Sequence, residues 1–244
     1  MGLSDYQSRR GNEKYAERDR RLQLMRGEIP DVTPHNGEKL PWAQLSDDRF
    51  DSDWSMRPVA LKGYFDHHGS VNVEKVINGK PYTSSLGEKI YEVVTPFYTH
   101  LDDKGKECGL LVNRGVVAYD LEGKNYQLHE DRGNVTITGY LYRGDPQNKY
   151  SRLNEPMVNL FYNVKPKDLS LYSHMPNYKE GADKIMFKMV DMDENLRRAY
   201  PCPPSAEELL HFEIEPERHE AYSKLWNVFT FLNILANTAL WIYF

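Results

Sequence analysis

Residues 225–244 read LWNVFTFLNILANTALWIYF and contain no charged side chain. An uncharged apolar run of about 18 residues or more can cross the ~30 Å hydrocarbon core of a bilayer as a helix, at ~1.5 Å rise per residue. Lys224 precedes the run, and Trp, Tyr and Phe stand near its two ends, which is typical of membrane–water interfaces. The stretch therefore predicts a single C-terminal transmembrane anchor; the alternative is a buried core helix that ends a soluble domain.

This predicted membrane helix carries a polar stripe. At ~100° per residue, five polar side chains fall on one side of it: Asn227, Thr230, Asn233, Asn237 and Thr238. Exposing these polar side chains to lipid would cost free energy, whereas Asn and Thr can hydrogen-bond across a helix–helix interface. We therefore expect Asn227, Thr230, Asn233 and Asn237 to bind transmembrane helices of a partner.

His219 lies just before the membrane run and falls on the same side as the stripe if the helix extends back to it. A neutral imidazole at this place can ligate a haem iron or hydrogen-bond a partner. The alternative is an interfacial histidine with no ligand role.

The middle of the chain is rich in β-forming residues. Short runs with strand patterns recur, separated by turn residues, at 59–61, 71–76, 91–97, 110–117, 135–141 and 185–190. Asn78-Gly79 is a strong hairpin signal, and Pro96 is expected to end or edge its strand. Residues 167–172 and 205–211 are weakly helical. The pattern predicts a mainly β (α+β) fold, with an antiparallel sheet or small barrel.

The N-terminal part is charged and then proline-rich. Residues 4–25 predict an exposed helix, with Ser4 or Asp5 as N-cap and Gly27 as its stop. Residues 28–58 predict a linker whose Trp42 and Trp54 pack against a core. The expected partition is a helix and linker over 1–57, a β-rich domain over 58–217 and the anchor over 218–244.

Composition excludes several classes of function. The net charge is −5 and acids and bases are interspersed, so no basic face for nucleic acid is expected. The N-terminus lacks the apolar core of a secretory signal, so any import must use another signal. Cys108 and Cys202 are not spaced as zinc ligands usually are, although a disulfide between them is an alternative. Common phosphate-binding, zincin and nucleophile motifs are missing, and His67 and His68 would point apart on a strand. We therefore expect no catalytic and no metal-binding residues.

Asn113-Arg114-Gly115 interrupts the apolar run at 110–117. A buried Arg needs a carboxylate or backbone partner, and Gly115 permits a bulge or close packing. A structural bulge and a docking site for a partner are both open at this point.

Several of these segments also carry a family resemblance. The order KGYFDH (62–67), YEVVTPF (91–97), LVNRGVV (111–117), VTITGYLYR (135–143) and RHEAYSKLW (218–226), running into a membrane helix, resembles the Surfeit locus protein 1 family. The most specific parts are the VNRG block and the pattern formed by His219, Tyr222 and Trp226. The opening residues 3–14 also resemble the family. Gln7, Arg10 and Lys14 match its pattern, and Tyr6 stands where a Trp is usual.

The resemblance implies an assembly factor of cytochrome c oxidase in the inner mitochondrial membrane, with its β-rich domain in the intermembrane space. It implies a chaperone-like role for the catalytic oxidase subunit, with His219, Tyr222 and Trp226 as candidate residues for transient haem a binding. Three departures stand out. The family's first membrane helix has no match, a Trp is replaced near residues 159–161, and a glycine-rich stretch is replaced by AEELLHFEIEPE (206–217).

Three functional hypotheses follow. The first is a non-enzymatic, single-pass protein that assembles respiratory complex IV by binding its subunits and inner-membrane lipids. The second is a permanent, non-catalytic accessory subunit of a divergent complex IV or supercomplex. The third is a tail-anchored enzyme with a β-barrel catalytic domain, which would need a pocket joining residues such as Asp66 and His129.

Overall fold

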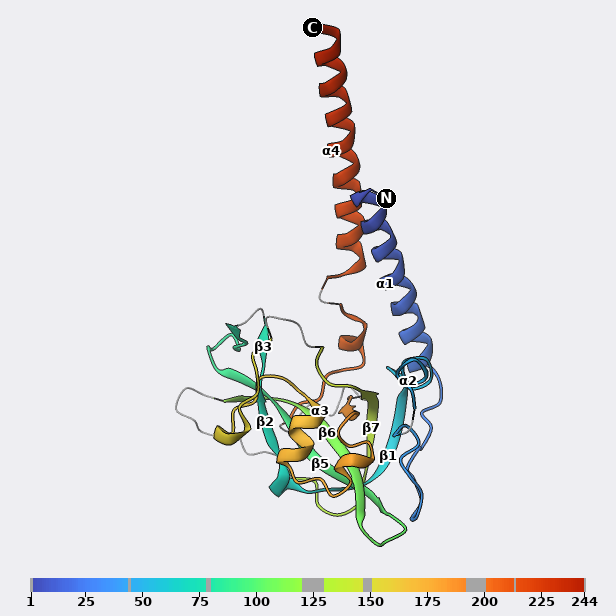
Figure 1. The fold of residues 1–244 in the computed structure, drawn as a ribbon, viewed down its shortest axis with the longest axis vertical. Helices are drawn as coiled ribbons and strands as arrows, with labels where there is room; N and C mark the ends of the chain where they lie inside the picture. The colour runs from blue at the N-terminus through green and yellow to red at the C-terminus, as the bar shows by residue number, and fades with distance from the viewer. Residues whose placement is uncertain are drawn as a thin grey trace. The chain divides into compact units, whose positions relative to one another are not determined.

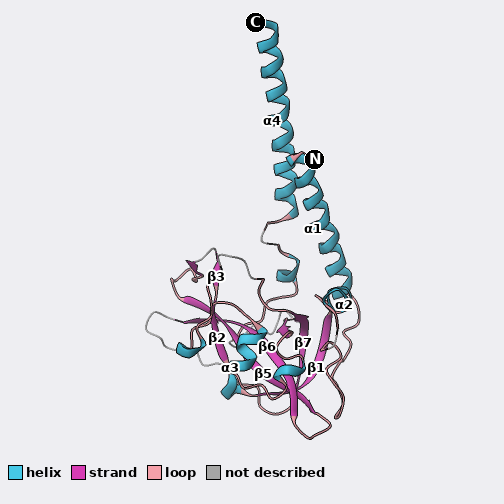
Figure 2. Cartoon of the chain, in the orientation of Figure 1, coloured by secondary structure: helices cyan, strands magenta, loops and turns pink. Residues whose placement is uncertain are grey.

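The computed structural model describes residues 2–43, 45–77, 80–119, 130–146, 151–191, 201–212 and 214–243. Contacts divide the chain into two compact units, one formed by 1–27 with 207–244 and the other by 28–206 (Figure 1). The first unit is helical and the second is built around a sheet (Figure 2). The segment 28–57, expected to be a linker, groups with the second unit.

The β unit is a small barrel. Its six-stranded sheet has the order β1-β7-β8-β6-β5-β2, and β1 also pairs with β5, so β1, β7, β8, β6 and β5 close on themselves. All of these pairings are antiparallel except β6 with β8, which is parallel. The predicted mainly β fold is confirmed. The strands are β1 (Pro58–Phe65), β2 (Val71–Glu74), β5 (Lys89–Leu101), β6 (Glu107–Tyr119), β7 (Val135–Tyr142) and β8 (Met186–Met189).

Alternating apolar side chains fill the barrel. Because successive residues of a strand point to opposite faces, Val59, Leu61 and Phe65 of β1 project inward and are buried. Trp42 and Phe50 complete the same cluster, Phe50 from the short helix α2 (Asp47–Asp53). Burying one such side chain contributes about 1.5–3 kcal/mol. These two aromatic residues explain why 28–57 belongs with the barrel.

A second apolar cluster lies under α3 (Pro166–Tyr172). It joins Val71 and Val73 of β2 to Phe161 and Leu169, which are all buried. The predicted helix at 167–172 is confirmed. Short elements connect the rest: η1 (His67–Gly69), β3 (Val76–Ile77), β4 (Lys80–Pro81), η2 (Pro156–Val158) and η3 (Tyr178–Glu180). The predicted turn Asn78-Gly79 lies outside the described residues, although the flanking β3 and β4 pair antiparallel.

Of the two expectations for Pro96, that it ends its strand is wrong. β5 continues through Pro96 to Leu101 and pairs with β6 along its length. On its other side β5 pairs with β2 over residues 91–94 and with β1 over residues 97–98. Pro96 falls between these pairings, so the missing N–H interrupts neither ladder. Its carbonyl still accepts a hydrogen bond from the Asp66 N–H at 3.0 Å.

β6 contains the bulge that Asn113-Arg114-Gly115 predicted. The pairing register between β5 and β6 shifts at Glu92–Val94, where β6 carries one extra residue. Gly115 has φ of +117°, and a Cβ there would lie 2.1 Å from the carbonyl oxygen of Cys202. Only glycine fits both the positive φ and the close approach of Cys202.

The helical unit is an antiparallel pair. Helix α1 (Leu3–Met25) begins after Gly2, whose N–H is 3.3 Å from the Asp5 carboxylate, so neither Ser4 nor Asp5 is the N-cap. Helix α4 spans Pro216–Tyr243 and follows η5 (Glu207–Leu210), where a weak helix was predicted. Arg18 of α1 pairs with Glu215 at 2.6 Å and with Glu217 of α4 at 2.9 Å. α1 is therefore packed along one side and exposed on the other.

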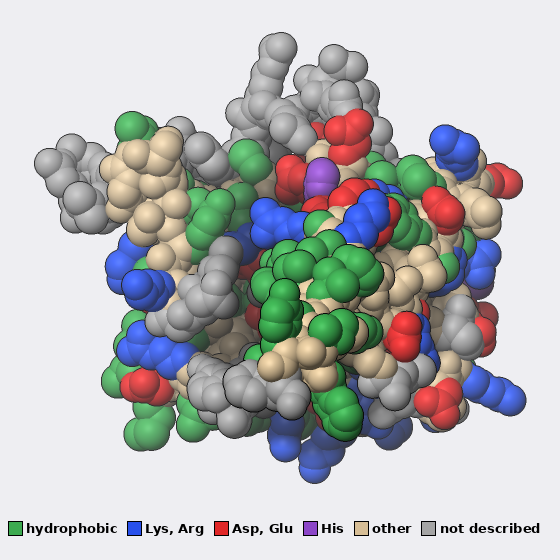
Figure 3. All heavy atoms as spheres, turned by 90° about the horizontal axis from the view of Figure 1, so that it is seen from above, with side chains coloured by type: hydrophobic (Ala, Val, Ile, Leu, Met, Phe, Trp, Pro, Cys, Tyr) green, Lys and Arg blue, Asp and Glu red, His purple; other side chains and the backbone are tan. Residues whose placement is uncertain are grey.

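Among the described residues, α4 is the one helix long and apolar enough to cross a membrane. Its most apolar 18-residue window has a mean hydropathy of 1.3 and is 0% buried, unlike a core helix. Viewed from its C-terminal end, hydrophobic side chains gather over α4 (Figure 3). The prediction of a C-terminal helix that could span a membrane is confirmed.

Candidate functional site on the α1–α4 helix pair

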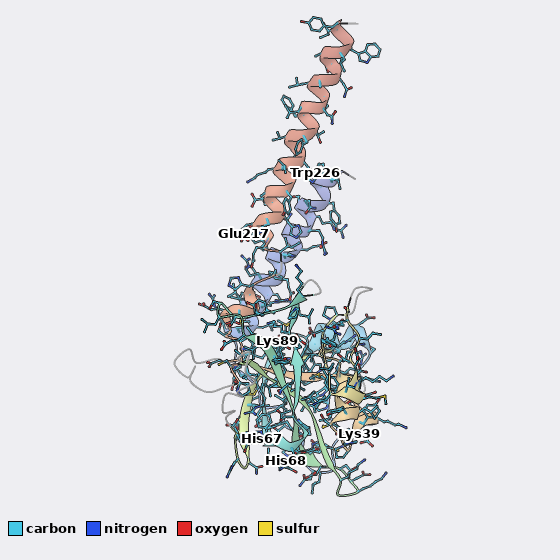
Figure 4. The ribbon with its side chains drawn as sticks, turned by 90° about the vertical axis from the view of Figure 1, so that its left-hand side faces the viewer. Lys39, His67, His68, Lys89, Glu217 and Trp226 are labelled. Atoms are coloured by element: carbon cyan, nitrogen blue, oxygen red, sulfur yellow. The ribbon has the colours of Figure 1, made fainter. Side chains whose placement is uncertain are left out.

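His219 lies in the interface between α1 and α4. Its side chain is held against Gly11 of α1: a Cβ built on Gly11 would be 3.4 Å from the Cβ of His219 and 3.4 Å from the Pro216 carbonyl. A glycine in the middle of a helix costs ~1 kcal/mol relative to alanine, and here it lets the two helices approach closely. The histidine is 8% exposed. Glu217 and Trp226, labelled in Figure 4, bracket this part of α4.

Gln7 orients the imidazole. Nδ1 of His219 is 2.7 Å from Oε1 of Gln7, and an amide oxygen can only accept a hydrogen bond. Nδ1 therefore carries the proton, and in the neutral ring Nε2 keeps its lone pair. No described residue is hydrogen-bonded to Nε2. A histidine that binds a metal characteristically donates its other ring N–H in this way, which fixes the tautomer and the ring orientation.

Tyr222 and Trp226 lie on the same side of α4 as His219. At ~100° per residue they are about 60° and about 20° away from it around the helix. Tyr222 is 45% exposed and Trp226 is 40% exposed, with the Trp226 ring 6.1 Å from that of Phe229. An oriented imidazole nitrogen beside exposed aromatic rings fits an apolar, iron-containing group such as haem. The structure thus places all three residues named for cofactor binding on one side of α4.

The polar stripe continues from this site along α4. The hydroxyls of Thr230 and Thr238 donate to carbonyls one turn back, and Nδ2 of Asn237 donates to the Asn233 carbonyl, each at 2.8 Å. The side-chain amides of Asn227 and Asn233 make no hydrogen bond to a described residue. Each such amide can form several hydrogen bonds, so the stripe keeps unused hydrogen-bonding capacity.

The polar stripe begins one turn of α4 beyond the N-terminal end of α1. Ser4, in the first turn of α1, is hydrogen-bonded to Ser223 of α4 at 3.0 Å. Asn227 lies one turn further along α4. Within the helical unit, the polar side of α4 is therefore covered by α1 up to Ser223 and uncovered beyond it.

Arg114 and its neighbours have a structural role in the barrel. Arg114 is 4% exposed, and it contacts the carboxylate of Asp131 at 3.1 Å, the ring of His67 at 3.3 Å and the face of Phe65. Burial lowers the pKa of Arg114, which the charge of Asp131 counteracts. These contacts favour the structural bulge over a docking site.

Asn113 is fully buried on the same bulge. Its amide nitrogen donates to the Glu92 carboxylate at 2.8 Å, and its oxygen accepts from the Gly115 N–H at 3.0 Å. The same amide nitrogen is 3.3 Å from the Tyr142 hydroxyl, and burial raises the pKa of Tyr142 well above its usual range. These contacts satisfy Asn113 inside the barrel and leave it no surface to offer a partner.

His67 and His68 do not lie on a strand as expected. They form η1, and the Asp66 carboxylate accepts from the His68 N–H at 3.0 Å as its cap. His67 uses both ring nitrogens, Nδ1 toward Arg114 and Nε2 toward the Asp131 carbonyl at 3.0 Å. His129, the other residue of the catalytic alternative, lies outside the described residues.

A cavity in the β unit was not foreseen. It has a volume of about 420 Å³ and is lined by the β5–β6 turn, by residues 37–43 and by the η3 segment; Lys39, labelled in Figure 4, is on its wall. Asp102, Cys108 and Glu180 meet there, with ligand atoms within 4.8 Å of one another. Cys108 and Cys202 are not joined by a disulfide. Cys202 pairs with Val116, eight residues along β6 from Cys108, or about 26 Å away.

Comparison with protein-family models matches residues 1–231 to the SURF1 family, the Surfeit locus protein 1 family that the sequence resembles. A search among curated proteins gave no match. The match covers the whole β unit and most of α4, so the predicted family is confirmed.

Proposed function

Because this chain belongs to the SURF1 family, which is associated with cytochrome c oxidase assembly, we propose that it assembles the oxidase by binding its subunits, without turnover. It is a single-pass protein of the inner mitochondrial membrane, anchored by α4, with the β unit in the intermembrane space. The exposed apolar surface of α4 supports the anchor. Its partners are oxidase subunits, foremost the catalytic one, and the surrounding lipids.

The hydrogen bond between His219 and Gln7 is the observation that carries the proposal. It fixes the proton on Nδ1 and leaves Nε2 of His219 as an electron-pair donor. We assign His219 as the ligand of haem a during its transfer to the catalytic subunit, with Tyr222 and Trp226 as flanking aromatic contacts. Haem a is cargo in this proposal, held transiently.

His219→Ala tests this assignment. We expect lower haem a content per oxidase in membranes that carry this variant, measured from reduced-minus-oxidised spectra. His211→Ala is the matched control, because His211 lies in the same unit but its side chain is exposed and paired with Glu215. Unchanged haem a content in His219→Ala, at equal protein level, would show that His219 has no role in haem binding.

The polar stripe favours a second candidate function, that of a permanent accessory subunit. Asn227 and Asn233 offer unused amides on a helix surface that lipid would solvate poorly. In this case the chain is present at about one copy per mature oxidase, purified in mild detergent. As an assembly factor it is found only with smaller, immature complexes. The same purification distinguishes the two.

A further inference from the structure

We propose that the cavity formed by the β5–β6 turn and η3 binds a divalent zinc-like ion through Sγ of Cys108 and the carboxylates of Asp102 and Glu180. These groups come from two places in the fold. Asp102 lies in the β5–β6 turn and Cys108 is the second residue of β6, so the hairpin itself brings these two together, whereas Glu180 ends η3. Local pairing does not bring Glu180 to them.

The geometry is close to that of a zinc site. With bonds of about 2.0–2.3 Å, neighbouring ligand atoms of a tetrahedral site lie about 3.3–3.8 Å apart. Here the three atoms lie within 4.8 Å of one another. Glu180 is exposed, so a small rotation of its side chain closes the difference.

The donor atoms are available. Oδ1 of Asp102 accepts from the N–H groups of Lys104 and Lys106, at 2.8 and 2.7 Å, which fixes the carboxylate and leaves Oδ2 unused. The Glu180 carboxylate makes no hydrogen bond or ion pair with a described residue. Both acids therefore present a free oxygen next to a buried sulfur.

Asn177 supplies an independent observation. It lines the same cavity and is 2% exposed. Its Nδ2 donates to the Gly109 carbonyl at 2.7 Å, but its Oδ1 is buried without a hydrogen-bond partner. A buried amide oxygen without a hydrogen-bond partner costs free energy. Gly109 follows Cys108 directly, so Asn177 lies beside the proposed sulfur ligand, and its Oδ1 can serve as the fourth donor atom, after one sulfur and two carboxylate oxygens, or hold a water on the ion.

The charge around the site also suits a cation. Burial, and then the negative charges of Asp102 and Glu180, raise the pKa of the Cys108 thiol. A divalent ion reverses that preference, because it binds the thiolate and neutralises the carboxylates, and one proton is released to solvent. The cavity is also lined by four lysines, Lys39, Lys104, Lys179 and Lys184. As ammonium groups they donate no electron pair, and they balance the remaining negative charge.

The donor set selects among metals. One thiolate with two carboxylates is a mixed set that suits Zn²⁺, whereas Cu⁺ prefers thiolates and thioethers, and Mg²⁺ and Ca²⁺ prefer oxygen alone. Once bound, the ion would tie the β5–β6 turn to η3.

Co²⁺ is the probe for the test, because a cobalt–thiolate bond produces a charge-transfer absorption. The full chain in mild detergent is titrated with Co²⁺ alone. We expect this absorption to saturate at one Co²⁺ per chain, to disappear on adding Zn²⁺ and to resist Mg²⁺. The absence of the absorption overturns the proposal.

The two cysteines provide matched variants. Cys108→Ser should lose the absorption and Cys202→Ser should keep it; the reverse result overturns the site. Glu180→Gln alters an exposed residue and should leave folding intact while lowering Co²⁺ affinity by at least about tenfold. Unchanged affinity in Glu180→Gln also overturns the site, even if Cys108→Ser fails to fold.

Discussion

Nδ1 of His219 lies 2.7 Å from Oε1 of Gln7, although 212 positions separate the two residues in the chain. This contact links the start of α1 to the start of α4, and it determines which imidazole nitrogen keeps its lone pair. It makes Gln7 a positioning residue for the proposed haem contact.

Gln7→Leu should therefore weaken haem handling without removing His219. The variant leaves the Nδ1–H without its acceptor, at a cost of about 1–3 kcal/mol to the helix pair, and frees the ring to rotate. We expect the haem a content of the oxidase to fall, as in His219→Ala. Gln7→Glu keeps an acceptor oxygen and should restore it. Asn12→Leu, an exposed change on α1, is the control; an equal loss there would point to a general effect on α1.

Gly11 sets the distance between α1 and α4. A single methyl group meets His219 and Pro216 at 3.4 Å, so Gly11→Ala should be tolerated and gain up to about 1 kcal/mol of helix propensity. Gly11→Leu should separate the helices, at a cost of about 1–3 kcal/mol. Hydrogen exchange of the α1 amides in detergent measures both. Faster exchange in Gly11→Ala than in wild type would contradict the prediction that a methyl group fits at Gly11.

Gly115 should be intolerant of any side chain. Gly115→Ala combines a positive φ with a Cβ 2.1 Å from the Cys202 oxygen, so the bulge must move. Gly133→Ala is the matched control, since it also has positive φ, +79°, but nothing within 4 Å of its Cβ. The control should cost about 1–2 kcal/mol. We expect Gly115→Ala to cost at least about 2 kcal/mol more in chemical denaturation; equal losses would show that the contact with Cys202 is loose.

Asp31 should contribute to acid stability. Hydrogen bonds from Lys62 and Thr33 lower its pKa to about 2. A carboxylate whose pKa is lowered by folding stabilises the fold above its unfolded pKa of ~3.9, and this stabilisation is lost as pH falls toward about 2. The difference in unfolding free energy between wild type and Asp31→Asn should therefore be largest above about pH 5 and vanish near pH 2. Asp103→Asn serves as the exposed control. A difference that stays constant over this range would contradict the assignment.

The sequence predicts the parts of this fold that depend on local patterns. Alternation places β1 and β7, Gly115 predicts the bulge, and the uncharged run predicts α4, because these signals depend on neighbours along the chain. The packing of Trp42 onto a core was also predicted and is confirmed. The parallel pairing of β6 with β8 and the burial of Phe50 depend on tertiary contacts that no local pattern encodes.

The same distinction holds for the sites. His219, Tyr222 and Trp226 were predicted together because they match the family's pattern, whereas helical periodicity related only His219 to the polar stripe. Gln7 was noted only as part of the family resemblance, since its distance to His219 depends on how α1 packs. The cavity was missed for the same reason. Asp102 and Cys108 flank one turn, but Glu180 lies 72 positions after Cys108 in the chain, and only the tertiary fold places it near them.

Helix α4 is longer than a bilayer core requires. Its 28 residues extend about 42 Å, whereas about 20 residues suffice for ~30 Å of hydrocarbon. The surplus is the first two turns, which α1 covers as far as Ser223. α1 carries charged side chains such as Arg9, Arg10 and Glu13 on its exposed side, and these cannot enter lipid cheaply. In the proposed membrane-anchored state, α1 therefore limits how far α4 inserts, because its charged side stays outside the hydrocarbon.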